Sequence, residues 1–187
     1  MILRFFRRND DRETIQRLYG AIVAQSRDPV FYTSYEVSDT IEGRFEMIIL
    51  HAFLLFHRLK EEGDERRQLG QRVFDAFCID MDANLREMGV GDLSVPKKMK
   101  RVAEAFYGRV GSYDAALSVL DDSELTEAVL RNVYGSNPGR AVEAQALATY
   151  IRSAVSALKA VPFETFARGE FPLPPAKDST FEESVAP

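Results

Sequence analysis

The chain has 187 residues, of which 45% are hydrophobic and 28% charged, the composition of one soluble domain large enough to bury a core. Its formal net charge of −5 argues against a protein that coats nucleic acid, because such proteins carry an excess of cations. A single cysteine, Cys78, excludes an internal disulfide and a thiolate metal cluster, so we expect a reducing compartment, the cytoplasm.

The amino-terminal arm, residues 1–9, begins with an apolar run that is broken at Arg4 and is too short for a secretory signal. Its mixture of apolar and basic residues suits the interface of an anionic membrane. Membrane contact is therefore one hypothesis for this arm, and a frayed or packed end is the alternative. The candidate contact residues are Ile2, Leu3, Phe5, Phe6, Arg7 and Arg8.

Two helices are predicted in the first third of the chain. Asn9 and Asp10 can cap the first, which Pro29 stops. Asp39 and Glu42 have the spacing of a capping box and open the second, which ends near Gly63. The second helix is apolar on two faces, which indicates packing on two sides and a central position. Its most apolar run, residues 47–56, is about half the length of a membrane span.

Apolar residues at intervals of three and four predict the remaining helices. One long helix ends at Gly89, and the next begins near Ser94 and Pro96 and ends at Gly108. A short helix is predicted after Ser112. The later helices are predicted between Asp121 and Gly135, between Pro138 and Leu158, and as a short piece after Pro162.

The last segment, residues 170–187, is rich in proline and charge, which predicts a flexible tail without a helix or a core. No stretch alternates convincingly between polar and apolar residues, so no strand is expected. The sequence therefore predicts an all-α chain. Its body, residues 10–169, is expected to be a single irregular multi-helix bundle.

The stretch MGVGDLSVPKKMKR, residues 88–101, combines two glycines with a cluster of cations. Gly89 suits the left-handed conformation that ends a helix, and Gly91 allows a second bend, so we interpret GVGD as a corner between helices. A dinucleotide-binding fingerprint would need a preceding strand. The cations lie in the first turns of the next helix, where the dipole disfavours each by about 0.3 to 1 kcal/mol. These cations are Lys97, Lys98, Lys100 and Arg101.

Residues that violate local structural preferences are concentrated at functional sites. This basic helix start is therefore a candidate docking surface for an anionic partner, with an ordinary solvated face as the alternative.

The two histidines, His51 and His57, are six residues apart and cannot share a metal-binding face of one helix. His51 is interpreted as a hydrogen-bonded structural residue, and a partner or haem contact is the alternative. No catalytic motif, metal site or cofactor site is expected.

Two segments together resemble the ubiquinol-cytochrome c chaperone family. They are EGRFEMIILHAFLLFHRL, residues 42–59, and FDAFCIDMDANLREMGVGDLSVPKKMKRVAEAFYGRVGSYDAAL, residues 74–117. The resemblance runs from about Tyr19 to Tyr134 and is densest at LREMGVGDLSVPKKMK. Because it starts so near Met1 that no mitochondrial presequence fits before it, we expect a bacterial member of the family.

The resemblance implies an all-α, non-enzymatic assembly factor for the cytochrome bc1 complex, respiratory complex III, that binds newly made cytochrome b. Mitochondrial members of the family also associate with ribosomes, so a ribosome is a further expected partner. An anionic membrane surface, at the inner face of the cytoplasmic membrane, is another. DNA is not an expected partner. The candidate partner surface combines the basic helix start with Tyr107, Arg109 and Tyr113. The alternatives are a helical enzyme acting on a hydrophobic substrate and a nucleic-acid or ribosome adaptor that uses residues 97–101. The oligomeric state is left open.

Overall fold

The computed structural model describes the backbone of residues 2–176 and the side chains of residues 11–176 except Glu65. Within these residues it contains helices and no strand, which confirms the all-α prediction. In chain order the elements are α1 (Ile2–Ser26), α2 (Val30–Thr33), α3 (Ile41–Leu59), α4 (Asp64–Glu87), α5 (Val95–Leu117), α6 (Ser123–Val133), the short 3-10 helix η1 (Pro138–Arg140), α7 (Ala141–Lys159) and α8 (Phe163–Ala167).

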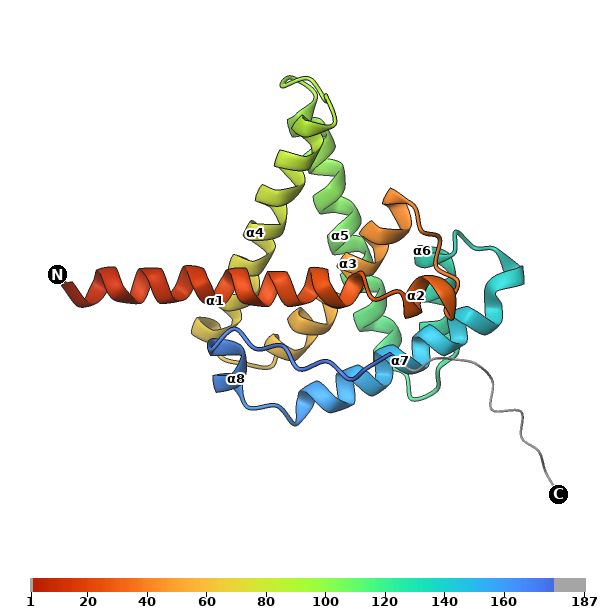
Figure 1. The fold of residues 1–187 in the computed structure, drawn as a ribbon. Helices are drawn as coiled ribbons and strands as arrows, with labels where there is room; N and C mark the ends of the chain where they lie inside the picture. The colour runs from red at the N-terminus through yellow and green to blue at the C-terminus, as the bar shows by residue number, and fades with distance from the viewer. Residues whose placement is uncertain (1, 177–187) are drawn as a thin grey trace.

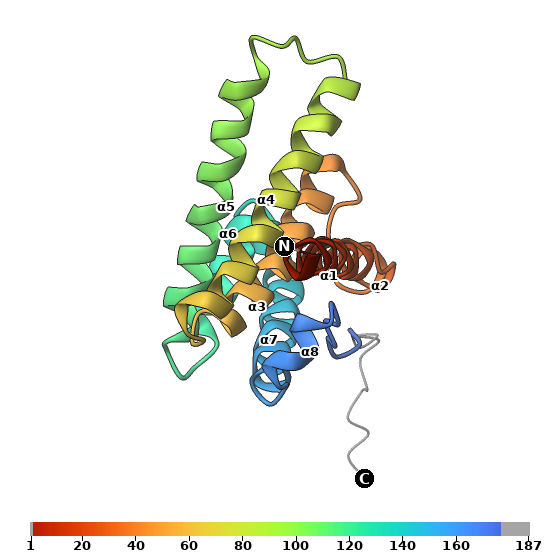
Figure 2. The same cartoon turned by 90° about the vertical axis from the view of Figure 1, so that its left-hand side faces the viewer.

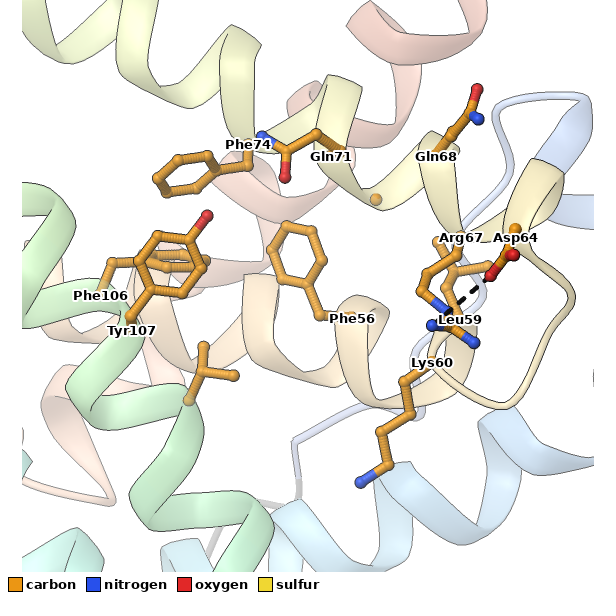
Figure 3. A pocket seen from close by; sticks show the side chains of 12 residues that line it. Phe56, Leu59, Lys60, Asp64, Arg67, Gln68, Gln71, Phe74, Phe106 and Tyr107 are labelled. Atoms are coloured by element: carbon orange, nitrogen blue, oxygen red, sulfur yellow. Dashed lines mark ion pairs between the residues drawn. The ribbon is translucent and has the colours of Figure 1, made fainter.

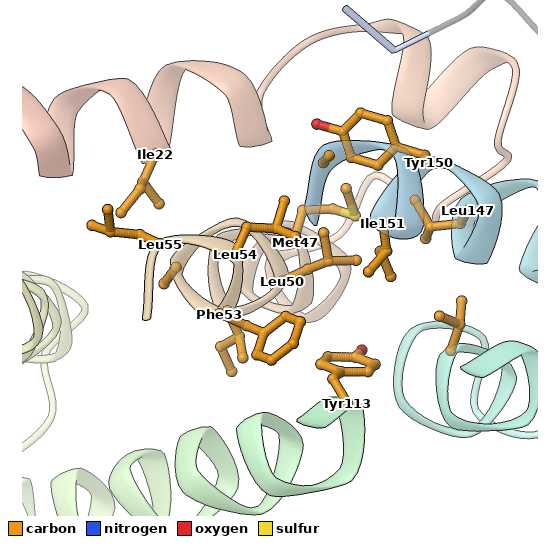
Figure 4. Close-up of a cluster of buried hydrophobic side chains, with 14 of the residues drawn as sticks. Ile22, Met47, Leu50, Phe53, Leu54, Leu55, Tyr113, Leu147, Tyr150 and Ile151 are labelled. Atoms are coloured by element: carbon orange, nitrogen blue, oxygen red, sulfur yellow. The ribbon is translucent and has the colours of Figure 1, made fainter. Parts of the chain in front are cut away.

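Helix α3 is the centre of the fold, as its two apolar faces predict. It contacts α1, α4, α5, α6 and α7, and Figure 4 shows side chains from α1, α5 and α7 converging on it. Side chains pointing in different directions from α3 are wholly buried: Phe53 toward α5, Leu55 toward α1, and Met47, Leu50 and Leu54 on a third side. Among the described residues no helix, α3 included, has both the length and the hydropathy needed to cross a bilayer.

Helices α4 and α5 form a long hairpin whose closed end projects away from the rest of the body (Figures 1 and 2). The base of the hairpin packs on α3, where Phe77 and Phe106 are buried in the continuous core. We call its far end, residues 86–101, the hairpin tip. Val95 in the tip is wholly buried but lies outside that core, so the tip has a small packing centre of its own.

The corner at Gly89 is confirmed. Gly89 has φ +80°, its N–H donates to the Arg86 carbonyl over 2.9 Å, and the N–H of Val90 donates to the Leu85 carbonyl over 3.0 Å. This pair of hydrogen bonds is the Schellman arrangement, which satisfies the last carbonyls of α4. Arg86 also pairs with Asp82 over 2.6 Å and with Asp92, so its guanidinium joins the end of α4 to the connecting loop.

The starts of two helices differ from prediction. Helix α1 begins at Ile2, so the predicted cap at Asn9 and Asp10 was wrong. The cap of α3 is Thr40, whose hydroxyl accepts a hydrogen bond from the Gly43 N–H over 3.1 Å. Asp39, the predicted cap, instead pairs with Arg44 over 2.6 Å. Both residues have side chains suited to capping, and the path of the preceding loop selects the second.

Helix α5 continues through Gly108 to Leu117, so the predicted end at Gly108 and the separate short helix after Ser112 were wrong. A glycine inside a helix costs only about 1 kcal/mol relative to alanine. The buried residues on either side of Gly108, Phe106 and Tyr113, outweigh this cost, because burying a large apolar side chain stabilises a protein by about 1.5 to 3 kcal/mol.

Part of the predicted tail packs on the body. Phe171 is buried with its ring 6.4 Å from that of Phe166, and the Thr14 hydroxyl donates to the carbonyl of Ala167 over 3.1 Å. Residues 170–176 thus follow α8 along the body. The rest of the predicted tail, residues 177–187, lies outside the described residues.

Two glycine-to-alanine substitutions should have opposite effects. At Gly108, which has open space around it inside α5, alanine should raise the free energy of unfolding by up to about 1 kcal/mol. At Gly43 a Cβ would lie 2.0 Å from the Ser38 carbonyl oxygen, so alanine should lower it by about 1 to 3 kcal/mol. Urea unfolding followed by circular dichroism measures both. Destabilisation by Gly108→Ala would contradict a continuous α5.

Candidate functional site

An apolar hollow opens where the base of the α4–α5 hairpin meets α3, and its volume is about 340 Å³ (Figure 3). Four aromatic residues form its wall in a chain of ring contacts. The Phe74 ring lies 4.7 Å from that of Phe106 and 5.1 Å from that of Tyr107, and Phe56 meets Phe106 edge to face at 5.5 Å. Tyr107 is 54% exposed, which leaves a large aromatic face open to a partner. We call this hollow the aromatic pocket.

Gly70 of α4 forms part of the pocket wall. A Cβ at this position would lie 2.9 Å from Cδ1 of Phe56, so only glycine lets the Phe56 ring lie this close to the α4 backbone. The pocket therefore depends on a small residue in the middle of a helix, where glycine is otherwise unfavourable.

The rim of the pocket is charged. Lys60 pairs with Asp114 over 2.9 Å, and Arg67 pairs with Asp64 over 3.7 Å (Figure 3). The Arg67–Asp64 pair is well exposed, so it contributes little to stability and can be exchanged for a partner's charge at low cost. The Lys60–Asp114 pair is partly exposed. An apolar floor inside a polar rim is the arrangement that holds an amphipathic helix or an apolar side chain.

Two of the larger hollows differ in character from the aromatic pocket. The groove between α1 and α4, of about 540 Å³, is bridged by hydrogen bonds from Tyr19 to Asp80 and from Arg72 to Asp11. A polar hollow of about 440 Å³ contains Glu36 and Glu46, but each is held in an ion pair with an arginine. Among the described residues, moreover, no three His, Cys, Asp or Glu side chains form a group that could hold a metal ion.

The structure divides the predicted partner surface among three places. Lys97, Lys98, Lys100 and Arg101 are exposed in the hairpin tip. Tyr107 lines the aromatic pocket, about 14 Å along α5 from Lys98. Arg109 and Tyr113 are turned toward α3, so the seven residues do not form one continuous face.

Arg109 forms an ion pair with Glu46 of α3 through two of its nitrogens. Burial raises the pKa of Glu46, and the hydrogen bond from Arg109 opposes that rise. Only 10% of the Glu46 side chain is exposed, so the carboxylate depends on this partner. Arg109 is therefore occupied with holding α5 on α3 rather than open to a client.

Tyr113 is wholly buried, with its ring 5.3 Å from that of Phe53 (Figure 4). Burial raises the pKa of its hydroxyl. A partner that docks on the folded protein cannot reach this side chain, so including Tyr113 in the predicted surface was wrong. Its position four residues after Arg109 puts both on the same face of α5, the one that packs inward.

His51 is wholly buried between α1, α3 and α7. Its Nδ1 lies 2.8 Å from the Met47 carbonyl oxygen, which only accepts, so Nδ1 carries the hydrogen and Nε2 accepts from the Tyr150 hydroxyl over 3.0 Å. Burial lowers the pKa of His51 to about 4. With both ring nitrogens satisfied by the protein, this is the structural histidine of the first interpretation, and a haem or partner contact would require the core to open.

The sequence predicted the pocket residues and the residues of the amino-terminal arm to different extents. The pocket residues Lys60, Arg67 and Phe74 carry no sequence signal of their own; Gly70 inside a long helix was the one available signal of a close approach. The predicted membrane-contact residues Ile2, Leu3, Phe5, Phe6, Arg7 and Arg8 belong to α1, but their side chains lie outside the described residues.

A helical body with an open aromatic pocket and a charged rim has the build of a protein-binding domain. The particular family follows from comparison with known proteins. The family model for the ubiquinol-cytochrome C chaperone matches residues 33–174, so the chain belongs to this family and the predicted resemblance is confirmed.

Relatives with established names cover most of this chain. Ubiquinol-cytochrome-c reductase complex assembly factor 1 of Xenopus laevis is 23% identical over 142 residues, which are 76% of this chain and 70% of the frog protein. The mitochondrial protein CBP3 of Saccharomyces cerevisiae is 26% identical over 149 residues, 78% of this chain but only 44% of the yeast protein. The chain thus spans under half of the yeast relative.

The crystal structure of the Cbp3 homolog from Brucella abortus has the same fold. Its TM-score is 0.84 at 39% sequence identity, over 94% of this chain and 98% of the Brucella chain. The α4–α5 hairpin and the helices around α3 therefore belong to an arrangement that a bacterial relative shares over nearly its whole length.

Acid should destabilise the protein through His51. Its pKa is about 4 in the folded state against an ordinary 6.5, so the unfolded chain takes up a proton first as the pH falls. Its contribution is fully present above pH 6.5 and lost as the pH falls to about 4, which amounts to about 3 kcal/mol. His51→Gln should unfold with a flatter pH dependence across this window in chemical denaturation. Parallel curves for the two proteins would contradict the buried, neutral histidine.

The Glu46–Arg109 pair should show strong coupling. Arg109→Met leaves a buried carboxylate unpaired and should lower the free energy of unfolding by about 3 kcal/mol. The double variant Glu46→Leu with Arg109→Met should recover most of that loss. Lys100→Met, which breaks the exposed pair between Lys100 and Glu104, is the control and should change stability by less than about 0.5 kcal/mol. Additive losses in the double variant would refute the coupling.

Proposed function

We propose that this protein is a non-enzymatic assembly chaperone of the cytochrome bc1 complex and that newly made cytochrome b is its client. The family and the names of the relatives, which are assembly factors of ubiquinol-cytochrome c reductase, support the first part. The observation that supports cytochrome b as the client is the aromatic pocket. It is an open apolar hollow on a protein whose other large apolar side chains are mostly buried.

The pocket suits one segment of an apolar helix rather than a small substrate. Its volume of about 340 Å³ is near the lower limit for ligand pockets and accommodates an apolar side chain or two. A helix places such anchors at intervals of three or four residues, so a partner helix can insert them into the pocket and lie across the exposed ring of Tyr107. The charged rim then keeps the complex in solution.

Holding a client in this way requires only moderate affinity. Cytochrome b must be protected while its apolar helices lack their final partners and then released to them. A pocket that buries one or two side chains gains a few kcal/mol, since each buried apolar side chain contributes about 1.5 to 3 kcal/mol. Assembly partners that bury whole helices therefore displace the chaperone without an energy source.

The alternatives have less support. A helical enzyme needs a polar group inside its pocket, yet the carboxylate at the aromatic pocket, Asp64, lies at the rim in an ion pair with Arg67. A nucleic-acid adaptor would use Lys97 to Arg101, whose exposure allows it, but the net charge of −5 opposes long-range attraction to polyanions. Association with a ribosome stays a prediction.

The first experiment compares reduced-minus-oxidised haem spectra of membranes from a deletion strain and its parent. Selective loss of the bc1 cytochrome b signal, with other b-type cytochromes retained, is expected. An unchanged spectrum under conditions that require the complex would refute the proposed function. Restoration by the wild-type gene and a reduced signal with Tyr107→Ala would connect the function to the aromatic pocket.

Contact with the client can be mapped by photocrosslinking. A benzophenone side chain in place of Tyr107 should give an adduct with cytochrome b, because this position borders the pocket. Ile41, which is 70% exposed at the start of α3, is the matched control and should give none. Equal adducts at both positions would indicate unspecific contact and contradict the assignment of the pocket.

A further inference from the structure

The hairpin tip, residues 86–101, projects far from the body (Figures 1 and 2). It exposes apolar side chains there. Leu93 is 98% exposed and Met88 57% exposed, although both lie in a well-formed corner closed by the hydrogen bonds around Gly89. Within the described part of the chain, no packing contact explains a leucine held fully in water at the end of a projecting hairpin.

The same tip is basic on a protein that is acidic as a whole. It contains five cations and two carboxylates, against a net charge of −5 for the chain. Arg86 is neutralised by Asp82 and Asp92, and Lys100 lies 3.7 Å from Glu104. Lys97, Lys98 and Arg101 form no ion pair within the described part of the chain. The positive end of the α5 dipole adds to their charge instead of compensating for it.

We propose that the hairpin tip docks this protein on an anionic phospholipid bilayer. Leu93 and Met88 enter the boundary between headgroups and acyl chains, and Lys97, Lys98 and Arg101 bind lipid phosphates around them. The proposal is independent of the client pocket: it accounts for the exposed leucine and for the unpaired cations with a single partner, since an anionic interface is apolar inside and negative outside.

RNA fits this tip less well than lipid. Residues 86–101 contain no aromatic side chain on which an unpaired base could stack, and an exposed aliphatic side chain gains nothing from a phosphate backbone. The closed corner also favours lipid. Arg86 joins α4 to the loop at Asp92, so Leu93 is presented by a preformed turn and little ordering entropy is lost on insertion.

A tryptophan reporter tests insertion directly, because the chain has no tryptophan. In the full-length Leu93→Trp protein, phosphatidylcholine vesicles containing phosphatidylglycerol should shift the emission to the blue, and brominated acyl chains should quench it. Leu120→Trp is the matched control, since Leu120 is also 98% exposed but lies between α5 and α6, and its emission should not change. No shift for Leu93→Trp, or equal shifts for both, would overturn the proposal.

Sedimentation with the same vesicles tests the charges. Each basic residue near an anionic surface contributes about 1 kcal/mol, or about fivefold in the partition coefficient. Lys98→Glu should therefore lower the partition coefficient by at least about fivefold and make it less sensitive to salt. Lys159→Glu, a reversal at the exposed end of α7, is the control and should not lower it.

Two further outcomes would count against the hairpin tip. Deletion of residues 1–8 tests the separate hypothesis that the amino-terminal arm binds the membrane, and α1 begins on a different side of the body from the tip (Figure 1). Binding that is abolished by this deletion and unaffected by Lys98→Glu would overturn the proposal. So would retention of the protein by RNA, sensitive to Lys98→Glu, in the absence of any binding to vesicles.

Discussion

Beyond its first turn α3 has no exposed residue, and this burial on all sides is the constraint on which the rest of the structure depends. A helix without a solvent face needs neighbours all around it, and α1, α4, α5, α6 and α7 fulfil that need. Each large side chain that α3 buries contributes about 1.5 to 3 kcal/mol, so these contacts decide where the outer helices lie. The same burial means that the two buried polar residues of α3, Glu46 and His51, need partners inside the protein, and they find them in Arg109 and in Tyr150.

Periodicity alone was enough to predict the fold class and the central place of α3, because a helix that is apolar on two faces is usually packed against other helices on two sides. The helix ends were less predictable. Asp39 and Thr40 are both good caps, and only the path of the loop decides between them. Gly108 is an ordinary place to end a helix, yet the inward side chains before and after it keep α5 continuous. A local helix preference of about 1 kcal/mol does not decide where a helix ends if the burial of neighbouring side chains stabilises the longer helix by more than that.

The candidate site was predictable only in part. Successive helical residues turn by about 100°, so Tyr107 and Arg109, two positions apart, had to face different directions once α5 was known to be one helix. That split, and the burial of Tyr113 on the side of Arg109, follow from spacing. The aromatic pocket does not, because it is made by α3, α4 and α5 together and depends on how closely Phe56 approaches Gly70. No single stretch of sequence contains that distance.

Helix α5 therefore joins two surfaces of different chemistry through one rigid rod. Its start carries the unpaired cations of the hairpin tip, and its middle carries Tyr107 of the aromatic pocket, about 14 Å further along the axis. The Glu46–Arg109 pair fixes the rotation of this rod on α3, so the two surfaces keep a constant relation to each other. If the tip rests on a bilayer, the pocket is held at a set height above it. Under the proposed function, an apolar client helix close to the membrane surface would then lie within reach of the aromatic ring, and covering its apolar side chains there would keep it from associating with other copies of the client.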